Sequence, residues 1–152
     1  MADNYTLFSQ VVPALKVKER QWALQLLQTG EHEAAERLSA AGIDVDLELD
    51  SWPAFQWELL PSRPVDLWVY SQDCGSPQQV ALFVQALLRC FRPRDVWTLT
   101  WAETCSRPRT GEFGGGGVIV TADAVRFYSA HEWVSAGVAG HCRAHRRRRG
   151  KR

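Results

Sequence analysis

The residues that could carry out chemistry in this 152-residue chain gather in one segment, CSRPRTGEFGGGG, which begins at Cys105. A cysteine nucleophile needs a base nearby and N–H groups that can stabilise an oxyanion. His131 is the only histidine in the second half of the folded part of the chain, and the glycine amides lie downstream of the cysteine. One hypothesis is therefore that Cys105 is a nucleophile with His131 as its base, although nothing in their spacing requires the two side chains to meet.

The four glycines of this segment, Gly114 to Gly117, do not form a known nucleotide-binding motif. A P-loop continues with Gly-Lys-Ser/Thr and a helix, whereas the residues after these glycines have a strand pattern. Successive glycine N–H groups can still bind an anion, with Arg107 and Arg109 as charged partners. Alternatively, the glycines permit a sharp turn and the close approach of another backbone. Two interpretations stay open, a rigid turn and a binding surface made by Arg107, Arg109, Glu112 and Phe113.

A second candidate binding surface lies in residues 43–50, where apolar and acidic residues alternate. The alternation predicts a half-buried strand with an acidic outer face. Side chains on one face of a strand are about 7 Å apart, so the acidic groups would stand in a row. Such a row can bind a cation, dock on a basic partner, or keep a sheet edge soluble. The acidic residues are Asp44, Asp46, Glu48 and Asp50.

Charge is distributed unevenly along the chain. Residues 1–142 contain 17 acidic and 11 basic residues, whereas residues 143–152 contain seven basic residues and no acidic one. The acidic body argues against nucleic-acid binding by the body itself, because phosphate contacts need a basic surface. The basic end can bind nucleic acid or an acidic protein surface without specificity. The residues expected to contact nucleic acid are Arg146, Arg147, Arg148 and Arg149.

Metal, cofactor and membrane signals are weak. His141, Cys142 and His145 have the side chains of a zinc site, but the neighbouring positive charges oppose cation binding and no second ligand pair accompanies them. We expect neither a metal site nor a cofactor. The four cysteines form no CxxC pair, no apolar run could cross a bilayer, and the first residues lack a signal-peptide pattern. These features predict a reduced, cytoplasmic protein without a membrane partner.

The elements that position these residues follow from hydrophobic periodicity. Strand patterns cover residues 4–12, 43–50, 55–60, 65–71, 95–103, 118–121 and 124–129. Helical patterns cover residues 16–28, 31–41, 77–91 and 129–138. We expect the first strand to lie at an edge, because Pro13 ends its pattern. We expect the third helix to be the most regular, with Ser76 as its cap and Pro77 in its first turn.

This order of elements predicts one α+β domain over residues 1–140, followed by a basic arm over residues 141–152. Its two layers would be a mostly antiparallel sheet and helices on one face. A ferredoxin-like β-α-β-β-α-β arrangement, extended by a hairpin, is the first topology hypothesis.

The segment WTLTWAETCSRPRTGEFGGGGVIVT, residues 97–121, resembles a motif of small uncharacterised proteins from bacteria, phages and plasmids. Those proteins share a tryptophan-rich strand, a T-C-S-[KR]-P-R segment and an F-G-G-G turn before another strand. The resemblance extends over residues 7–134 and does not include the basic end. It implies no known activity and a mobile-element setting.

These features predict a non-enzymatic module that binds a protein, as an accessory or inhibitor protein of a phage or mobile element acting on a host protein. Arg107 and Arg109 would pair with carboxylates of the partner, and Phe113 would fill a pocket. Two alternatives stay open. One is nucleic-acid binding through the basic arm, and the other is an enzyme with a Cys105 nucleophile or a nucleotide site at the glycines.

Overall fold

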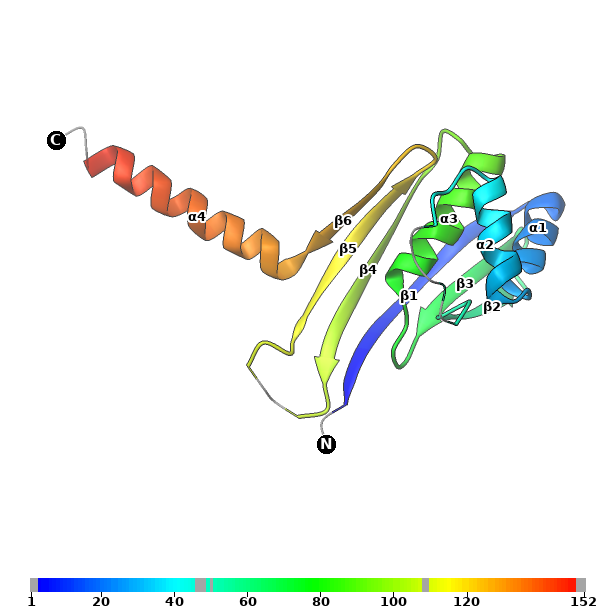
Figure 1. Cartoon of the computed structure of the whole chain (residues 1–152), viewed down its shortest axis with the longest axis horizontal. Helices are drawn as coiled ribbons and strands as arrows, with labels where there is room; N and C mark the ends of the chain where they lie inside the picture. Colours follow the sequence, from blue (N-terminus) through cyan, green and yellow to red (C-terminus); the bar gives the residue numbers. More distant parts are fainter. Residues whose placement is uncertain (1–2, 46–48, 50, 108–109, 150–152) are drawn as a thin grey trace.

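The computed structural model describes residues 3–45, 49, 51–107 and 110–149, and for residues 141–142 and 144–149 it describes the backbone alone. Within these residues the chain forms six strands and four helices (Figure 1). In chain order they are β1 (Asn4–Leu15), α1 (Val17–Leu27), α2 (Glu31–Ala40), β2 (Gln56–Leu60), β3 (Val65–Ser71), α3 (Pro77–Phe91), β4 (Val96–Cys105), β5 (Gly114–Thr121), β6 (Val125–Ser129) and α4 (Ala130–Arg149).

All six strands belong to one antiparallel sheet in the order β2-β3-β1-β4-β5-β6. β1 is thus an inner strand, and the prediction that it lies at an edge is wrong. Pro13 does not end the strand, because the register between β1 and β3 shifts between Val12 and Leu15, where Ala14 has a φ of 55°. A proline is tolerated at such a bulge, since the regular ladder is already interrupted there.

Two helical connections each cross one strand of the sheet. α1 and α2 connect β1 to β2 across β3, and α3 connects β3 to β4 across β1. The hairpin β5–β6 extends the sheet beyond β4. The α+β class is confirmed, with helices α1, α2 and α3 on one face of the sheet (Figure 1). The connectivity follows the β-α-β-β-α-β order extended by a hairpin, and the ferredoxin-like name itself stays a prediction.

Helix α3 lies at the centre of the core and is the element that the sequence predicts best. Its apolar residues recur every three or four positions, and Val80, Phe83, Val84 and Leu87 are all completely buried. Ser76 caps the helix, because its Oγ accepts a hydrogen bond from the backbone N–H of Gln79 at 3.2 Å. The sheet side chains that join this core are Phe8, Val12, Leu67, Val69, Trp97, Leu99, Val118 and Val120.

The strand predicted over residues 43–50 is absent from the described part of this segment. Ile43, Asp44 and Val45 belong to no strand, and neither does Leu49. Ile43 and Leu49 are nevertheless buried, with 4% and 7% of their surface exposed. The alternation therefore reports alternate burial, which an irregular segment achieves here. Asp44 is exposed, as an acidic outer face requires, whereas Asp46, Glu48 and Asp50 lie outside the described residues, so the acidic row stays a prediction.

A buried ion pair joins α1, the end of α3 and the bulge of β1. Arg92 donates from Nε and Nη2 to the Glu19 carboxylate at 3.0 and 2.7 Å. It also donates to the backbone carbonyls of Pro13 and Ala14 at 2.8 and 2.7 Å. Glu19 is only 2% exposed, and its Oε2 also accepts from the N–H of Lys16. The hydrogen bonds from Arg92 have the largest effect and, with the bond from the Lys16 N–H, hold the pKa of Glu19 below its usual value.

Replacing Arg92 by leucine should lower the free energy of unfolding by about 3–5 kcal/mol, because Glu19 would remain buried without its counter-charge. Arg94 is an exposed arginine two residues away, so Arg94→Leu is a matched control and should change stability by less than about 0.5 kcal/mol. Urea unfolding followed by tryptophan fluorescence measures both. Equal effects of the two substitutions would show that the ion pair does not stabilise the fold.

The same pair should make stability depend on pH. Because the folded-state pKa of Glu19 lies below its ordinary value of 4.5, its contribution is fully present above that value. The contribution is lost as the pH falls through the lowered folded-state pKa. The difference in unfolding free energy between the wild type and Arg92→Leu should thus be constant near neutrality and shrink in acid.

Candidate functional site

The four glycines form the first half of strand β5 and not a turn. Gly114 to Gly117 pair with Glu103 to Thr100 of β4, and the turn between the two strands lies before them. The expected close approach of another backbone is present. A Cβ atom at Gly115 would lie 2.4 Å from the carbonyl oxygen of Trp101, and one at Gly116 would lie 2.4 Å from that of Tyr128. Side chains are thus excluded here by neighbouring strands on both sides.

The indole of Trp101 occupies the space that a side chain at Gly116 would fill. A Cβ at Gly116 would lie 2.5 Å from this ring, which also packs edge-on against Phe127 with ring centroids 6.2 Å apart. The Nε1 of Trp101 donates to Glu103 Oε1 at 3.3 Å. A large aromatic side chain on β4 thus covers a strand that has no side chains of its own, and a carboxylate fixes its orientation.

A groove of about 550 Å³ opens beside this glycine strand, where α4 begins. We call it the α4 groove. It is lined by Gly114 to Gly117 of β5, by Trp101 of β4, by Tyr128 of β6, and by Trp133 and Val134 of α4. Tyr128 is 48% exposed, Trp133 76% and Val134 55%, so the aromatic and aliphatic groups at the groove face solvent.

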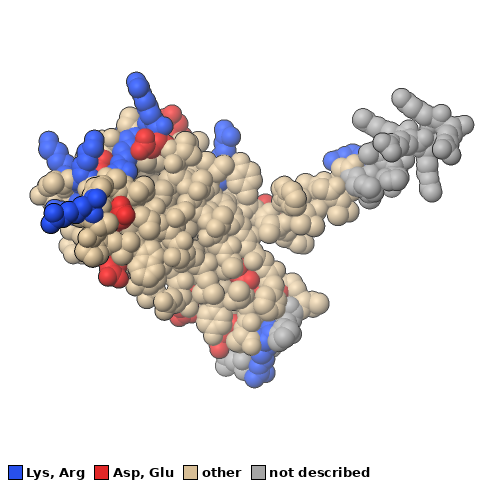
Figure 2. Space-filling model, turned by 180° about the vertical axis from the view of Figure 1, so that it is seen from behind, with Lys and Arg blue, Asp and Glu red and all other residues tan. Residues whose placement is uncertain are grey.

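Exposed apolar side chains are concentrated around this groove. Of the nine large apolar residues that are exposed in the described part of the chain, seven fall between residues 113 and 138. Single exposed apolar residues are ordinary, but a contiguous group marks an interaction site. Three of the seven, Tyr128, Trp133 and Val134, line the groove itself. Seen from behind, the middle of the body and the base of α4 carry few charged side chains (Figure 2).

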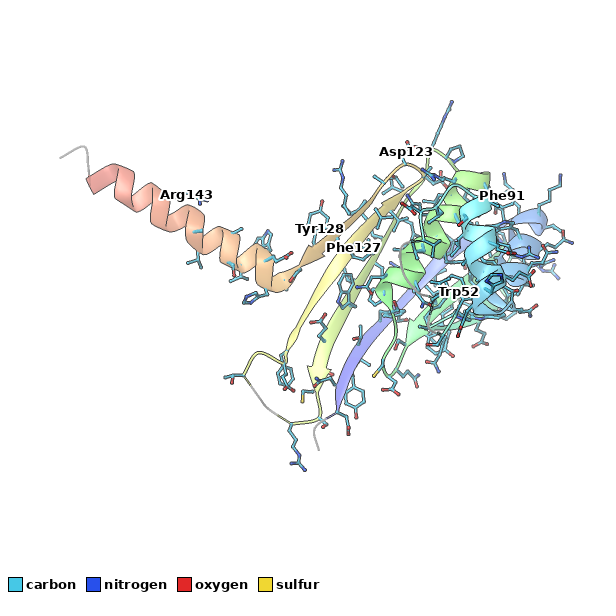
Figure 3. All side chains as sticks on the ribbon, viewed as in Figure 1. Trp52, Phe91, Asp123, Phe127, Tyr128 and Arg143 are labelled. Atoms are coloured by element: carbon cyan, nitrogen blue, oxygen red, sulfur yellow. The ribbon has the colours of Figure 1, made fainter. Side chains whose placement is uncertain are left out.

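Helix α4 leaves the body at the end of β6 and extends away from it (Figure 1). It runs from Ala130 to Arg149, so it continues well past residue 138, where the sequence pattern places its end. The predicted basic arm is therefore helical up to Arg149 and has no break at residue 140. Every side chain from His131 to Ala139 is exposed. Arg143 lies far along the helix from the body (Figure 3).

The structure describes only part of the sequence-predicted binding residues. Arg107 is exposed in the turn after β4, Glu112 is partly buried, and Phe113 is 56% exposed just before the first glycine of β5. Arg109 lies outside the described residues. The backbone of Arg146, Arg147, Arg148 and Arg149 lies in α4, and their side chains are not described.

The proposed catalytic pair comes from two different elements. Cys105 ends β4 and pairs with Asn4 of β1, whereas His131 is exposed in the first turn of α4. No hydrogen bond joins the two side chains within the described part of the chain. The sequence did place Trp133 and Val134 in a helix, but it gave them no binding role. The sequence pattern that could have indicated a binding role for Trp133 and Val134 is a predicted helix that continues directly into a run of arginines.

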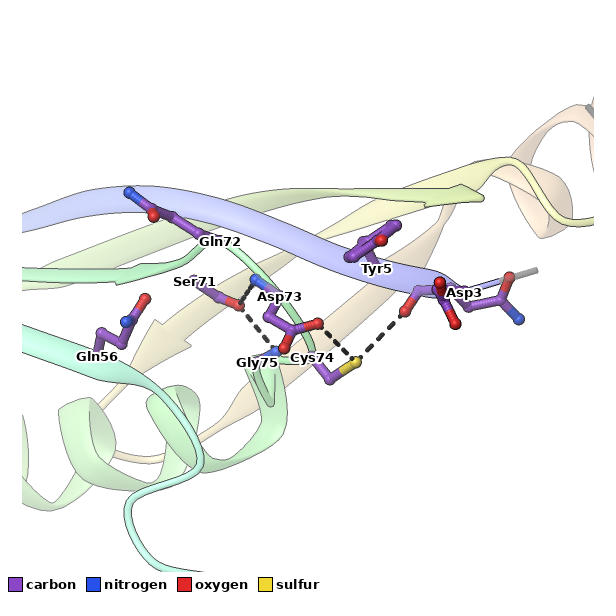
Figure 4. A pocket seen from close by; sticks show the side chains of 9 residues that line it. Asp3, Tyr5, Gln56, Ser71, Gln72, Asp73, Cys74 and Gly75 are labelled. Atoms are coloured by element: carbon purple, nitrogen blue, oxygen red, sulfur yellow. Dashed lines mark hydrogen bonds between the residues drawn. The ribbon is translucent and has the colours of Figure 1, made fainter. Parts of the chain in front are cut away.

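A separate cleft of about 1110 Å³ lies between the start of β1 and the turn after β3 (Figure 4). Ser71 Oγ accepts from the N–H groups of Asp73 and Gly75 at 3.2 and 2.8 Å, which closes this turn. The Cys74 thiol donates to Asn4 O and Asp73 Oδ1, each at 3.3 Å. Its hydrogen bond to Asp73 raises the pKa of Cys74, which keeps the thiol protonated and poorly nucleophilic.

The described residues contain no group of three or more His, Cys, Asp or Glu side chains placed to hold a metal ion. Among the helices of these residues, none combines the length and apolar character needed to cross a bilayer. Comparison with known proteins gives no further assignment, because no family model, curated protein or solved structure matches the chain.

Adding one methyl group at Gly116 should destabilise the protein by about 1–3 kcal/mol, because its Cβ would overlap Tyr128 O and the Trp101 ring. Gly117 is the matched control, since a Cβ there would lie 3.4 Å from its nearest neighbour, Leu99 O. Thermal unfolding of Gly116→Ala and Gly117→Ala compares them. If both unfold at the wild-type temperature, the close packing of β4, β5 and β6 does not constrain this strand.

Proposed function

We propose that this protein is a non-enzymatic protein-binding module and that the α4 groove is its contact surface. One observation carries the proposal, namely that α4 projects from the body with its apolar side chains exposed beside an open groove. Helices in proteins are stabilised mainly by packing an apolar face against another element. Among the described residues, no element packs along the exposed apolar side of α4, which fits a surface that a partner covers.

The chemistry of the groove favours a protein over a small molecule. Tyr128 and Trp133 offer aromatic rings, which dominate the energetics of protein interfaces when a partner buries them. The glycines of β5 that also line the groove have no side chains, so they leave backbone groups at the groove where Trp101 does not cover them. Phe113 lies next to this strand in sequence and adds a third exposed aromatic group.

The setting of the interaction is also part of the proposal. The resemblance of residues 97–121 to proteins of phages and plasmids supports an accessory or inhibitor protein that binds a protein of a bacterial host. Cys74, Cys90 and Cys105 are free thiols, which supports a reducing compartment such as the cytoplasm. Arg107, exposed in the turn after β4, remains available for a carboxylate of the partner.

Capture from a bacterial lysate tests the surface. Replacing Trp133 by serine should reduce recovery of a bound protein at least about tenfold, since a buried aromatic anchor contributes 2 kcal/mol or more. Val17 is 61% exposed on α1, away from the groove, so Val17→Ser is the control and should retain the partner. Equal recovery with both variants would refute the α4 groove as the contact surface.

A second function, nucleic-acid binding by the basic half of α4, is favoured by one observation. The backbone of residues 143–149 is helical and leads away from the acidic body. A nucleic acid bound to this part of the helix would therefore keep its phosphates away from the carboxylates of the body. Seven basic residues beyond position 142 predict binding that weakens steeply with salt and ignores sequence.

Fluorescence anisotropy with a short labelled DNA duplex, measured at several salt concentrations, tests this second function. Deleting residues 143–152 should abolish binding, because the remaining body is net acidic. The control deletes only residues 150–152, which leaves five of the seven basic residues. If the variant that lacks residues 143–152 binds the duplex with wild-type affinity, the basic end has no role in binding.

A further inference from the structure

We propose that the outer edge of β6, the side that faces away from β5, binds an extended segment of a partner protein. This segment adds to the sheet as a further strand and carries an acidic residue between two apolar ones. The inference goes beyond the proposed function, because it concerns a surface other than the α4 groove and does not require that groove to be occupied. It rests on the backbone of β6, on its apolar side chains and on Arg126.

The edge position of β6 follows from the strand order β2-β3-β1-β4-β5-β6. β6 pairs with β5 from Ser129 to Val125 without a shift in register. Among the described residues, no strand follows β6 in this order, and α4 begins where β6 ends (Figure 1). The outer edge of β6 is therefore open between the hairpin turn and α4, and an open edge is a template for another strand.

The hydrogen-bond pattern shows which backbone groups of β6 point outward. In the hairpin turn, the Thr121 N–H donates to Ala124 O at 2.9 Å, so these two residues face each other as a hydrogen-bonded pair. Bonded and non-bonded pairs alternate along antiparallel strands. By this alternation, the N–H and C=O groups of Val125 and Phe127 point away from β5. Within the described part of the chain, no hydrogen bond engages these outward groups.

Such a row of donors and acceptors selects an extended chain as the occupant. Outward groups at every second residue repeat at the spacing of a β-strand, so a second strand can pair with all of them. The backbone groups inside a helix are already bonded to one another, so a helix cannot pair in this way. Strand addition of this kind is a recurring mode of peptide recognition, in which side chains at alternate positions determine specificity.

The opposite edge of the sheet, β2, is less suited to accept a strand. Pro61 follows β2 directly, and Pro53 lies three residues before it. Prolines lack the N–H group that pairing requires, and natural sheets use them to protect their edges. No proline lies within or beside β6, and its register with β5 contains no bulge.

On the face of the sheet that carries α3, the outer edge of β6 is apolar. Val125 pairs with Val120, and Phe127 pairs with Val118, a residue only 1% exposed. Val125 packs against the core, whereas Phe127 is 46% exposed and contacts Trp101 edge-on. α3 packs on β5 rather than on β6, so the helical layer stops short of Phe127. Apolar side chains of an added strand would extend this layer.

On the other face, the side chain between these two is Arg126. It is exposed, and together with Ile119, Thr121 and Ala124 it lines a hollow of about 190 Å³. Among the described residues it forms no ion pair. Because the backbone of Arg126 bonds to β5, this residue would face an added strand across a non-hydrogen-bonded pair, in which side chains are closest. An acidic side chain at that position can bind the guanidinium group.

This charge also favours a partner over a second copy of the chain. β6 contains Arg126 and no acidic residue, so the β6 of another copy would offer it no carboxylate. A partner segment with the order apolar, acidic, apolar satisfies both faces of the edge at once. Complementary charge of this kind fixes the register of an interface.

Amide hydrogen exchange measured by NMR tests the edge, with the capped peptide Thr-Thr-Val-Asp-Val-Thr-Thr as the probe. In the free protein, the amides of Val125 and Phe127 should exchange rapidly and those of Arg126 and Tyr128 slowly, because only the latter two are bonded to β5. A saturating amount of the peptide should slow exchange at Val125 and Phe127 at least about tenfold.

Two results would overturn the inference. One is unchanged exchange at Val125 and Phe127 with the peptide at about 5 mM, a concentration at which even weak complexes form. The other is protection of these two amides without any peptide that increases with protein concentration, because a second copy would then occupy the edge.

A charge swap tests the role of Arg126 by titration of two labelled peptides. The peptide with lysine in place of aspartate should bind the wild type at least about fivefold more weakly, since an attractive pair becomes a repulsive one. Arg126→Glu should reverse this preference, whereas Arg94→Glu, a matched change at an exposed arginine outside β6, should keep it. Equal binding of both peptides to the wild type would refute the assigned chemistry of the edge.

Discussion

The contact of Trp101 with the glycines of β5 is the constraint on which the candidate surface depends. Because the carbonyls of Trp101 and Tyr128 lie where side chains would stand, β5 must be built from glycine at positions 115 and 116. Glycines have no side chains to shield their own backbone from solvent. Trp101 covers part of this strand, and the rest lines the groove at the start of α4. The same glycines that permit tight strand packing thus leave a groove open.

The molecule is divided into a well-packed part and a thin part. Around α3 the sheet has a full helical layer, and Phe83, Val84 and Leu87 are completely buried there. The Glu19–Arg92 pair stabilises the layer at one end, since its hydrogen bonds join α1, the end of α3 and β1. α4 stands outside this layer and contacts mainly β5 and β6. We therefore expect a partner to bind at α4, because binding elements are commonly found in the less stable parts of a fold.

Local periodicity predicted the fold class and most element positions, because burial and secondary structure agree in those segments. Helix α3 shows this best, since its cap at Ser76 and its apolar spacing both mark the same boundaries. Residues 43–45 show the limit, because alternation reports burial whether or not a strand partner exists. The four glycines predicted a turn, because local sequence alone favours one there. Their strand conformation depends on Trp101 and Tyr128 of the neighbouring strands, which a local pattern does not include. The α4 groove was not predicted, because the exposure of Trp133 depends on the direction of α4, which no local pattern encodes.

The face of the sheet opposite the helices offers a competing surface, and its chemistry argues against it. Trp68 and Tyr70 lie on that face and stack on each other with ring centroids 3.9 Å apart. The Trp68 indole N–H donates to Ser9 Oγ at 2.9 Å, so its polar group is already satisfied. Both rings are partly buried within the protein, whereas Trp133 is 76% exposed. A partner would therefore gain more by covering α4, where apolar area is still in water, than by covering a face that has largely covered itself.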